Sequence, residues 1–257
     1  MYMKLISYNQ EWSVQLEEYI QSAIPAFYRW IGKLGTTEEN FSIFLVTDKQ
    51  KENIKGVMTY FRGFYAELRG TKSAIKLLID KLPNKIQILN IEKSHQHILE
   101  NKRKIQKAQI DVLLCMEKEN MLQEITYKSS ELKEKNKQEI CQLLIRADPK
   151  EWGSLEPEDV PMPEDWKWFG IWKEERLINV GAISLNKFRG TITYLATAPK
   201  ERRKSYAISM IYYLLSIHFS FAKLALINTR KANKSALKLY KKVGFKVYNH
   251  YGDFVIQ

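Results

Sequence analysis

The most constraining feature of this 257-residue chain is the order of elements that its sequence predicts between Tyr194 and Phe245. A β-branched run over residues 191–197 predicts a strand that ends before Pro199. Four cationic residues follow, and apolar residues then recur at helical spacing from Ala207 onward. A basic turn between a strand and a helix is typical of an anion site, because the first helical amides lack intrahelical acceptors and the helix dipole favours negative charge there. We therefore expect this part of the chain to bind a phosphate-bearing ligand.

Two motifs in this stretch resemble the GNAT acetyltransferase superfamily. The family's acetyl-CoA pyrophosphate loop reads P-x-x-[QR]-x-x-G-x-[GA], and the corresponding residues here are Pro199, Arg202, Ser205 and Ala207. Further along, the family has N-x-x-A-x-x-[LF]-Y and then Gly-Phe, which stand here as Asn233, Ala236, Leu239, Tyr240, Gly244 and Phe245. The resemblance covers residues 165–257 well and residues 128–164 loosely.

The first motif departs from the family at two positions. Ser205 stands where the family has its central Gly, and Arg203 stands where Gly is common. A Cβ at residue 205 can crowd a backbone amide that must approach the pyrophosphate closely, although Ser is a small replacement. Whether Ser205 still permits cofactor binding is left open by the sequence.

The resemblance implies a cofactor site and a catalytic residue. It implies a pyrophosphate cradle formed by Arg202, Arg203, Lys204, Ser205, Tyr206 and Ala207. It also implies that Leu195, Ala196 and Thr197 offer backbone groups to the pantetheine and polarise the thioester carbonyl. Tyr240 aligns with the family's general acid toward the CoA thiolate, and packing in a short helix is its alternative role. Asn233 is either the N-cap of that helix or a pantetheine contact, and capping is favoured.

The acceptor side is also assigned through the resemblance, since in the family the loop after the first helix borders the acceptor pocket. Acidic residues and tryptophans gather here between residues 151 and 168. Carboxylates and indoles suit a cationic amine through ion pairing and cation–π contact, so we expect Glu151, Trp152 and Glu156 to bind the acceptor. A solvated acidic loop with aromatic anchors is the alternative. No general base is identified, because residues 178–198 contain neither Asp nor Glu.

The composition is that of a folded protein, with 45% hydrophobic and 12% aromatic residues. Cys115 and Cys141 are the only cysteines, so neither a disulfide framework nor a metal site is expected. The first residues lack the layout of a signal peptide, and we expect a cytoplasmic protein. The apolar stretch 208–227 is long enough for a membrane span, but polar residues interrupt it, and a buried helix followed by a buried strand explains it better.

The positive charge of the chain is unevenly placed. The net charge is +12, and residues 199–246 contain twelve Lys and Arg residues but only one acidic residue, Glu201. Such a cluster indicates a face that binds phosphate, either of a nucleotide-like cofactor or of nucleic acid. A solvated surface rich in Lys is the alternative for any single residue.

The order of predicted elements in the first half matches the order in the second. The first half predicts helices at 11–24, 73–82 and 94–107 and strands at 41–47, 54–62, 64–69, 85–91 and 109–117. The second half predicts helices at 131–146, 203–219 and 233–243 and strands at 167–173, 177–186, 190–198, 222–228, 245–250 and 253–256. Ser129 or Ser130 is expected to cap the helix at 131–146.

The predicted fold class is α/β with mixed sheets: two tandem GNAT-like domains, each a twisted mixed β-sheet flanked by helices. We expect a degenerate domain without the cofactor motif at residues 1–127 and the acetyltransferase domain at residues 128–257. The third strand of the first half passes from Glu67 through Arg69 into Gly70 without a Pro-x-x-Arg stretch. That domain is expected to complete a sheet or wall an acceptor pocket.

The resemblance implies an N-acyltransferase that moves acetyl from acetyl-CoA, without a metal, to a small-molecule or peptide amine by direct attack in a ternary complex. One alternative is a non-catalytic CoA-sensing or nucleic-acid-binding module on the same fold. Another is an aminoacyl-tRNA-dependent transferase. Nucleic acid is not favoured as a partner, no membrane partner is expected, and the acceptor and the oligomeric state are left open.

Overall fold

The computed structural model describes residues 3–27, 29, 41–48, 53–61, 63–121, 126–185, 190–220 and 222–257. The chain forms two compact units, of which the first contains residues 1–113, 229–232 and 248–257 and the second contains residues 114–228 and 233–247. The first unit therefore takes in the C-terminal segment of the chain. The division of function into domains 1–127 and 128–257 stays a prediction. Residues 122–125 at the predicted join, and the predicted strand ends 62 and 186, lie outside the described residues.

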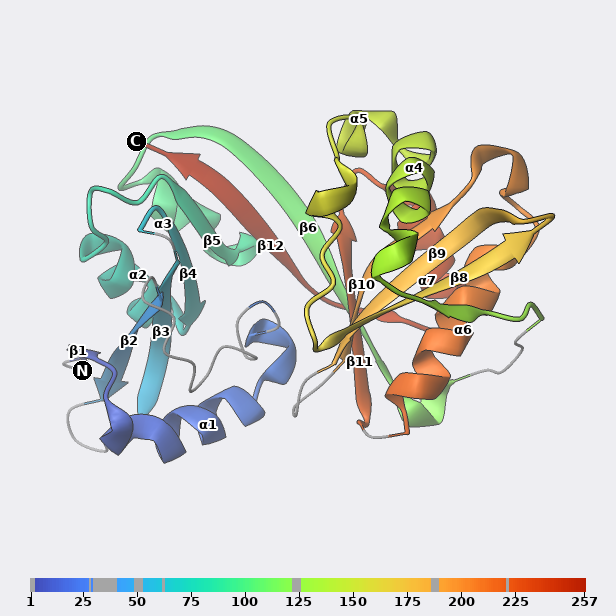
Figure 1. The fold of residues 1–257 in the computed structure, drawn as a ribbon. Helices are drawn as coiled ribbons and strands as arrows, with labels where there is room; N and C mark the ends of the chain where they lie inside the picture. The colour runs from blue at the N-terminus through green and yellow to red at the C-terminus, as the bar shows by residue number, and fades with distance from the viewer. Residues whose placement is uncertain are drawn as a thin grey trace. The chain divides into compact units, whose positions relative to one another are not determined.

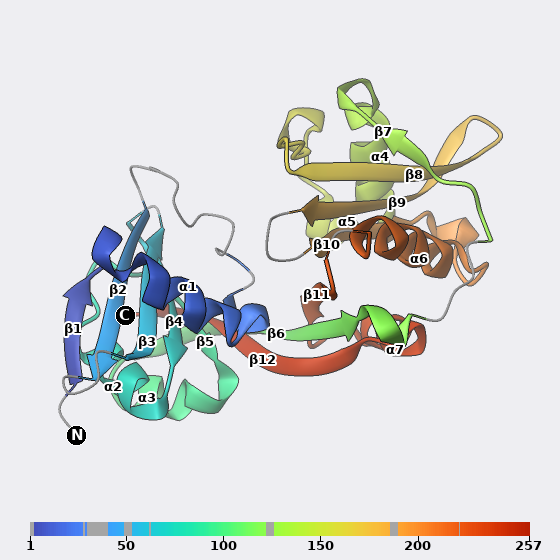
Figure 2. The same ribbon diagram turned by 90° about the horizontal axis from the view of Figure 1, so that it is seen from below.

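The first unit is a mixed sheet with short helices. Its strands follow the order β1-β2-β3-β4-β5-β12-β6, in which β4 and β5 are parallel and the pairs β1–β2, β2–β3, β3–β4 and β5–β12 are antiparallel. The elements are β1 (Met3–Ser7), α1 (Ser13–Gln21), β2 (Phe41–Asp48), β3 (Ile54–Phe61), β4 (Tyr65–Gly70), α2 (Lys72–Asp80), β5 (Ile88–Glu92), α3 (Gln96–Glu100), β6 (Ile105–Glu117) and β12 (Lys246–Ile256). Figure 1 and Figure 2 both show β6 and β12 running side by side.

The second unit repeats this plan. Its strands follow the order β6-β11-β10-β9-β8-β7, and β10 and β11 form its parallel pair. The further elements are β7 (Ser130–Leu132), α4 (Lys137–Ala147), α5 (Pro149–Trp152), β8 (Trp166–Lys173), β9 (Arg176–Leu185), β10 (Gly190–Thr197), α6 (Tyr206–His218), β11 (Leu224–Arg230) and α7 (Lys234–Val243). In each unit a parallel strand pair is thus joined through one helix, α2 in the first and α6 in the second. The predicted mixed-sheet fold is confirmed.

Helices α4 and α6 cover opposite faces of the second sheet, because successive residues of a strand point to opposite sides. Val180 and Ala182 of β9 pack in one cluster with the buried residues of α4. Gly181, between them, faces α6, where an added Cβ would lie 2.6 Å from Met210 Cγ. Glycine at this position therefore lets α6 approach the sheet closely.

The apolar stretch 208–227 forms a helix followed by a strand, as the sequence predicts. Helix α6 ends at His218, whose buried ring contacts the Leu224 carbonyl oxygen through Nε2 at 2.8 Å, and β11 begins at Leu224. Among the described residues, no helix is both long and apolar enough to cross a membrane.

Three element predictions are wrong. Residues 130–132 form strand β7 against β8, and α4 begins only at Lys137, so neither Ser129 nor Ser130 caps it. The helix expected at 94–107 is limited to Gln96–Glu100, since β6 begins at Ile105. The two strands expected after residue 244 are one strand, β12, because Gly252 lies within it, paired with Ile91 of β5.

Candidate active site

The site begins where strands β10 and β11 part. Their parallel register pairs Gly190 with Ala225, Thr191 with Leu226 and Ile192 with Ile227, and no later residues of these two strands pair. Strand β10 nevertheless continues to Thr197, still paired with β9 on its other side after a bulge next to Ile192. The backbone edge of Leu195, Ala196 and Thr197 that faces away from β9 therefore has no pairing with β11.

Asn179 of β9 fixes the end of β10. Its fully buried side chain donates from Nδ2 to the Ala196 carbonyl oxygen at 2.9 Å and to Thr197 Oγ1 at 2.8 Å. Its Oδ1 is buried without a hydrogen-bond partner among the described residues. Sequence reasoning missed this residue, because an Asn inside a β-branched run carries no motif. Its role is to hold the peptide between residues 196 and 197 in place.

The turn between β10 and α6 has left-handed backbone at two non-glycine residues. After a single 3-10 turn at Pro199–Glu201, Arg203 and Ser205 both have φ of 64°. These are the two positions at which the resembling family has Gly. The backbone thus keeps a glycine-like path although both residues carry a Cβ, at a cost of roughly 1–2 kcal/mol for each.

The turn presents free amides at the start of α6. The first backbone hydrogen bond of the helix runs from Ser209 N to the Ser205 carbonyl oxygen at 3.0 Å, and the Ser205 side chain makes no capping bond. The amides of residues 206–208 therefore have no acceptor within the helix, whose N-terminus favours an anion. This geometry fits a phosphate group, the expected ligand of this turn.

The cationic residues of the turn are partly engaged with the protein. Arg202 donates from Nη2 to the Ala147 carbonyl oxygen at 2.6 Å and from Nε to the Thr197 carbonyl oxygen at 3.4 Å. Lys204 and Lys173 both contact Glu201, at 2.9 Å and 3.5 Å. The bond to Lys204 lowers the pKa of Glu201 and raises the pKa of Lys204. Arg202 and Lys204 thus stabilise the conformation of the turn in addition to giving it positive charge.

Tyr127 stabilises the turn through hydrogen bonds, although it lies far from the turn in the sequence. Its hydroxyl donates to the Lys204 carbonyl oxygen at 3.1 Å, and its amide donates to Ser209 Oγ at 3.0 Å. Its ring lies 4.2 Å from the Tyr206 ring, centroid to centroid. No sequence pattern predicted this residue, since it lies far from the motif along the chain. It packs directly against the turn that carries the two left-handed residues.

Tyr240 lies on α7 and is almost fully buried. Burial raises its pKa to about 12, so the phenol is protonated at neutral pH. Gly244, with φ of 116°, ends the helix, and Phe245 N donates to the Tyr240 carbonyl oxygen at 3.0 Å. Asn233 caps the same helix by accepting from Ala236 N at 3.1 Å. A buried, protonated phenol on a helix capped at both ends can act as a proton donor of fixed position.

The segment predicted to bind the acceptor contacts β10 through an aromatic cluster. The ring of Tyr194 lies 5.4 Å from Trp152, 5.9 Å from Trp166 and 4.8 Å from Trp168. Trp168 is buried and donates to the Pro161 carbonyl oxygen at 2.7 Å, whereas Trp152 is partly exposed. Glu151 and Glu156 are exposed on this segment. The structure therefore places Trp152 beside the strand that carries Leu195, with acidic residues close to it in the chain.

The first unit has a similar fork, that is, a place where two parallel strands separate. In this unit a side chain of the protein, Arg69, occupies the fork. Strands β4 and β5 pair only as far as Glu67 and Asn90, although β4 continues to Gly70. The buried Arg69 guanidinium donates from Nη1 to the Leu68 carbonyl oxygen at 2.9 Å and to the Asn90 carbonyl oxygen at 3.2 Å. It also contacts Glu67 at 3.3 Å and lies over the Tyr251 ring at 4.4 Å. Two carbonyl groups at the point where β4 and β5 separate are therefore satisfied by a side chain of the protein itself.

Comparisons with known proteins agree with this geometry. Residues 137–245 match the model of the Acetyltransferase (GNAT) family. A GNAT-family acetyltransferase from Colwellia psychrerythraea is similar at 10% identity and a TM-score of 0.59, covering 99% of this chain and 100% of that chain. A GCN5-related N-acetyltransferase from Sphaerobacter thermophilus is similar at 11% identity and a TM-score of 0.63, covering 99% and 95%. A tandem GNAT protein from the clavulanic acid biosynthesis pathway is similar at 8% identity and a TM-score of 0.60, covering 98% of both chains.

The chain matches no curated protein in sequence. At the low identities above, the likeness to solved structures shows a shared fold. The family match covers residues 137–245, and the structural likeness covers nearly the whole chain, so the fold is that of GNAT proteins. Residues 137–245 resemble the GNAT acetyltransferase family in sequence, and the chain as a whole has the fold of a tandem GNAT protein.

Proposed function

We propose that this protein is an acetyl-CoA-dependent N-acetyltransferase that acetylates an amine by direct attack in a ternary complex. The observation that carries the proposal is the opening of β10 away from β11 directly before a turn with free amides. Acetyl-CoA has an extended arm with amide groups, the pantetheine, next to a diphosphate. The edge of the strand can supply hydrogen-bond donors and acceptors to the arm, and the start of the helix can supply donors to the diphosphate.

The residues present fit acetyl-CoA. The amides of residues 206–208 and the exposed cations of the turn would hold its pyrophosphate, and the open edge of residues 195–197 would hold its pantetheine arm. When bound, acetyl-CoA supplies an acetyl group held as a thioester, from which the CoA thiolate is a good leaving group. Asn233 is proposed to act chiefly as the cap of α7, since its Oδ1 already accepts two hydrogen bonds.

Tyr240 is proposed as the general acid. Its raised pKa keeps the phenolic proton available at physiological pH. Backbone amides near Leu195 are proposed to polarise the thioester carbonyl. Since residues 178–198 contain no carboxylate, a water molecule is proposed to accept the proton of the attacking amine.

The acceptor is proposed to be a cationic small-molecule or peptide amine. Support comes from the partly exposed Trp152 beside Tyr194 and from the exposed carboxylates Glu151 and Glu156 on the same segment. Indole faces and carboxylates attract ammonium groups. We place the protein in the cytoplasm, because Cys115 and Cys141 are both free thiols.

The test is a calorimetric and thermal titration with acetyl-CoA, CoA and ATP, followed by detection of released thiol with a panel of amines. A ligand at a hundred times its Kd should add about 2.7 kcal/mol to the free energy of unfolding. Saturable binding of both CoA species but not ATP, with amine-dependent thiol release, is the expected result. Binding without thiol release would indicate a CoA sensor, and no binding of either CoA species would overturn the proposal.

A further inference from the structure

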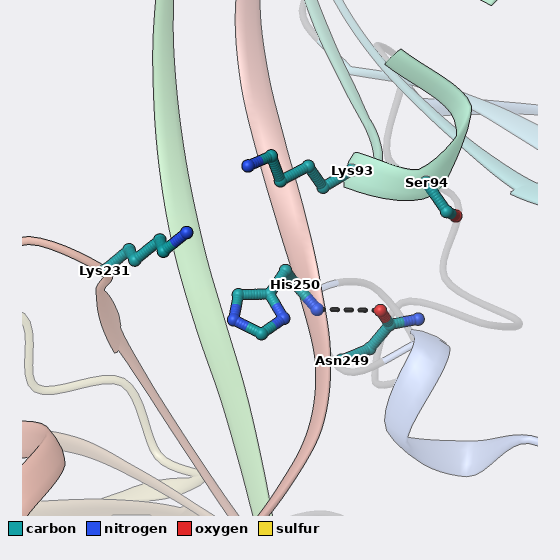
Figure 3. Close-up of a pocket in the computed structure, with 5 residues that line it drawn as sticks. All are labelled: Lys93, Ser94, Lys231, Asn249 and His250. Atoms are coloured by element: carbon teal, nitrogen blue, oxygen red, sulfur yellow. Dashed lines mark hydrogen bonds between the residues drawn. The ribbon is translucent and has the colours of Figure 1, made fainter. Parts of the chain in front are cut away.

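A cationic pocket lies in the first unit, and none of its lining residues belongs to the candidate active site. It has a volume of about 440 Å³ and is lined by Lys93, Ser94, Lys231, Asn249 and His250. Lys93 follows the end of β5, Lys231 follows the end of β11, and His250 lies on β12. In Figure 3 the ammonium ends of both lysines point toward the space beside the His250 ring. Three segments distant in sequence thus place three basic groups together.

The carboxylate of Glu92, the residue before Lys93, is bound by other side chains. The register of β5 and β12 pairs Glu92 with Tyr251, so Glu92 and Asn249 share one face of the strands, while His250 points to the other. Asn249 Nδ2 donates to Glu92 Oε2 at 2.9 Å, and the Ser94 hydroxyl donates to the same atom at 3.4 Å. The Glu92 carboxylate therefore accepts hydrogen bonds from Asn249 and Ser94, and it lies on the face of the strands opposite His250.

The basic groups repel one another. The pKa of His250 is lowered by partial burial and by the positive charges of Lys231 and Lys93, and no acidic group of the described residues contributes to it. Bringing like charges together costs free energy unless a counter-charge joins them. An oxyanion between them would relieve that cost, and each basic group would supply a charge-assisted hydrogen bond.

We propose that Lys93, Lys231 and His250 form a binding site for a phosphate group, as the free anion or as a phosphomonoester. A tetrahedral dianion has enough oxygens to accept from both ammonium groups and from the imidazolium at once. The site is independent of the acetyl-CoA site and stands whether or not acetyl transfer is confirmed.

The test follows the ring protons of His250 by NMR across a pH titration of the full-length protein. Inorganic phosphate is compared with chloride at constant ionic strength, and glycerol 3-phosphate forms a third arm. Phosphate should raise the pKa of His250 in a saturable manner, because the bound anion favours the imidazolium. A stronger effect of glycerol 3-phosphate would identify a phosphomonoester as the ligand, and equal effects would identify the phosphate group alone.

A double substitution, Lys93→Gln with Lys231→Gln, supplies the matched control, and the exposed His97 serves as an internal reference. The double variant should lose the response of His250 to phosphate while keeping its fold, since both lysines are exposed. An unchanged pKa of His250 in phosphate would overturn the proposal. So would the same response at His97, or an equal response in the double variant.

Discussion

Arg202 Nη2 lies 2.6 Å from the carbonyl oxygen of Ala147, the last residue of helix α4. A cation that the motif assigns to the pyrophosphate therefore also ties the turn to the C-terminal end of a helix, where the dipole favours positive charge. These contacts within the protein fix the conformation of the turn in the absence of a ligand, so ligand binding need not order it.

Replacement of Arg202 by Met is expected to loosen the turn. Two hydrogen bonds from an exposed guanidinium are lost, so the free energy of unfolding should fall by about 1 kcal/mol, and the Kd of acetyl-CoA should rise about tenfold. Lys200→Met is the matched control, because it removes the same charge from an exposed neighbour. Calorimetry decides the outcome: an equal loss of affinity in both variants would mean that Arg202 acts only through its charge.

Ser205→Gly is expected to stabilise the protein slightly. The left-handed φ of 64° costs a serine roughly 1–2 kcal/mol, and glycine adopts it freely, although glycine loses about 0.5–1 kcal/mol of that gain to entropy. Ser154→Gly, at an exposed residue without positive φ, should instead lower stability. Chemical denaturation compares the two, and equal destabilisation by both substitutions would contradict the strain described at Ser205.

Tyr240→Phe is expected to slow turnover while leaving the Kd of acetyl-CoA nearly unchanged. Loss of a general acid lowers kcat by about 100-fold or more, whereas the phenylalanine ring preserves the packing of α7. Steady-state kinetics and calorimetry on the same preparation separate the two effects. A variant with normal kcat would assign Tyr240 to packing alone.

Stability should fall as the pH rises above 10, in part through Tyr240. Its pKa is about 12 in the folded state and near 10 in the unfolded state, so between these values the folded state holds a proton that the unfolded state has lost. The free energy of unfolding then decreases by about 1.4 kcal/mol per pH unit. Below pH 10 this group makes no pH-dependent contribution. Urea denaturation at pH 9 and pH 11 should show a smaller decrease for Tyr240→Phe than for the exposed control Tyr248→Phe, and equal decreases would contradict the assignment.

Arg69→Met is expected to destabilise the first unit strongly. It leaves the buried Glu67 and Asn90 without the guanidinium, and breaking a buried ion pair in this way costs about 3–5 kcal/mol. The exposed Lys107→Met provides a control of equal charge change on the same unit.

We also expect calorimetry to show one CoA bound per chain, since Arg69 already occupies the fork between β4 and β5. Two equivalents per chain would show that both forks bind CoA.

The sequence predicted the parts of the site that are local in the chain. The order of β10, turn, α6, β11 and α7 follows from β-branched residues, Pro199 and apolar spacing, and the structure has each element there. The cap at Asn233 is also a local signal, and the structure shows it. Such features depend on neighbours within a few residues, which a sequence displays directly.

The missed features depend on contacts between distant residues. Three side chains make such contacts with residues on other strands or other parts of the fold: Asn179, Tyr127 and Arg69. No regular spacing in the sequence reveals them. Ser129 and Ser130 precede a polar run that suits a helix start, yet pairing with β8 draws residues 130–132 into a strand. Tertiary pairing there overrides local preference. The parting of β10 and β11 likewise depends on register, which the sequence leaves unspecified.

Strand β12 carries residues 248–256 into the first unit, although more than a hundred positions separate them from its other strands. During synthesis the first unit must therefore wait, with β5 paired to β4 but not yet to β12, until residues 248–256 have left the ribosome. A nascent chain arrested before Tyr248 should keep that edge exposed to chaperones and proteases.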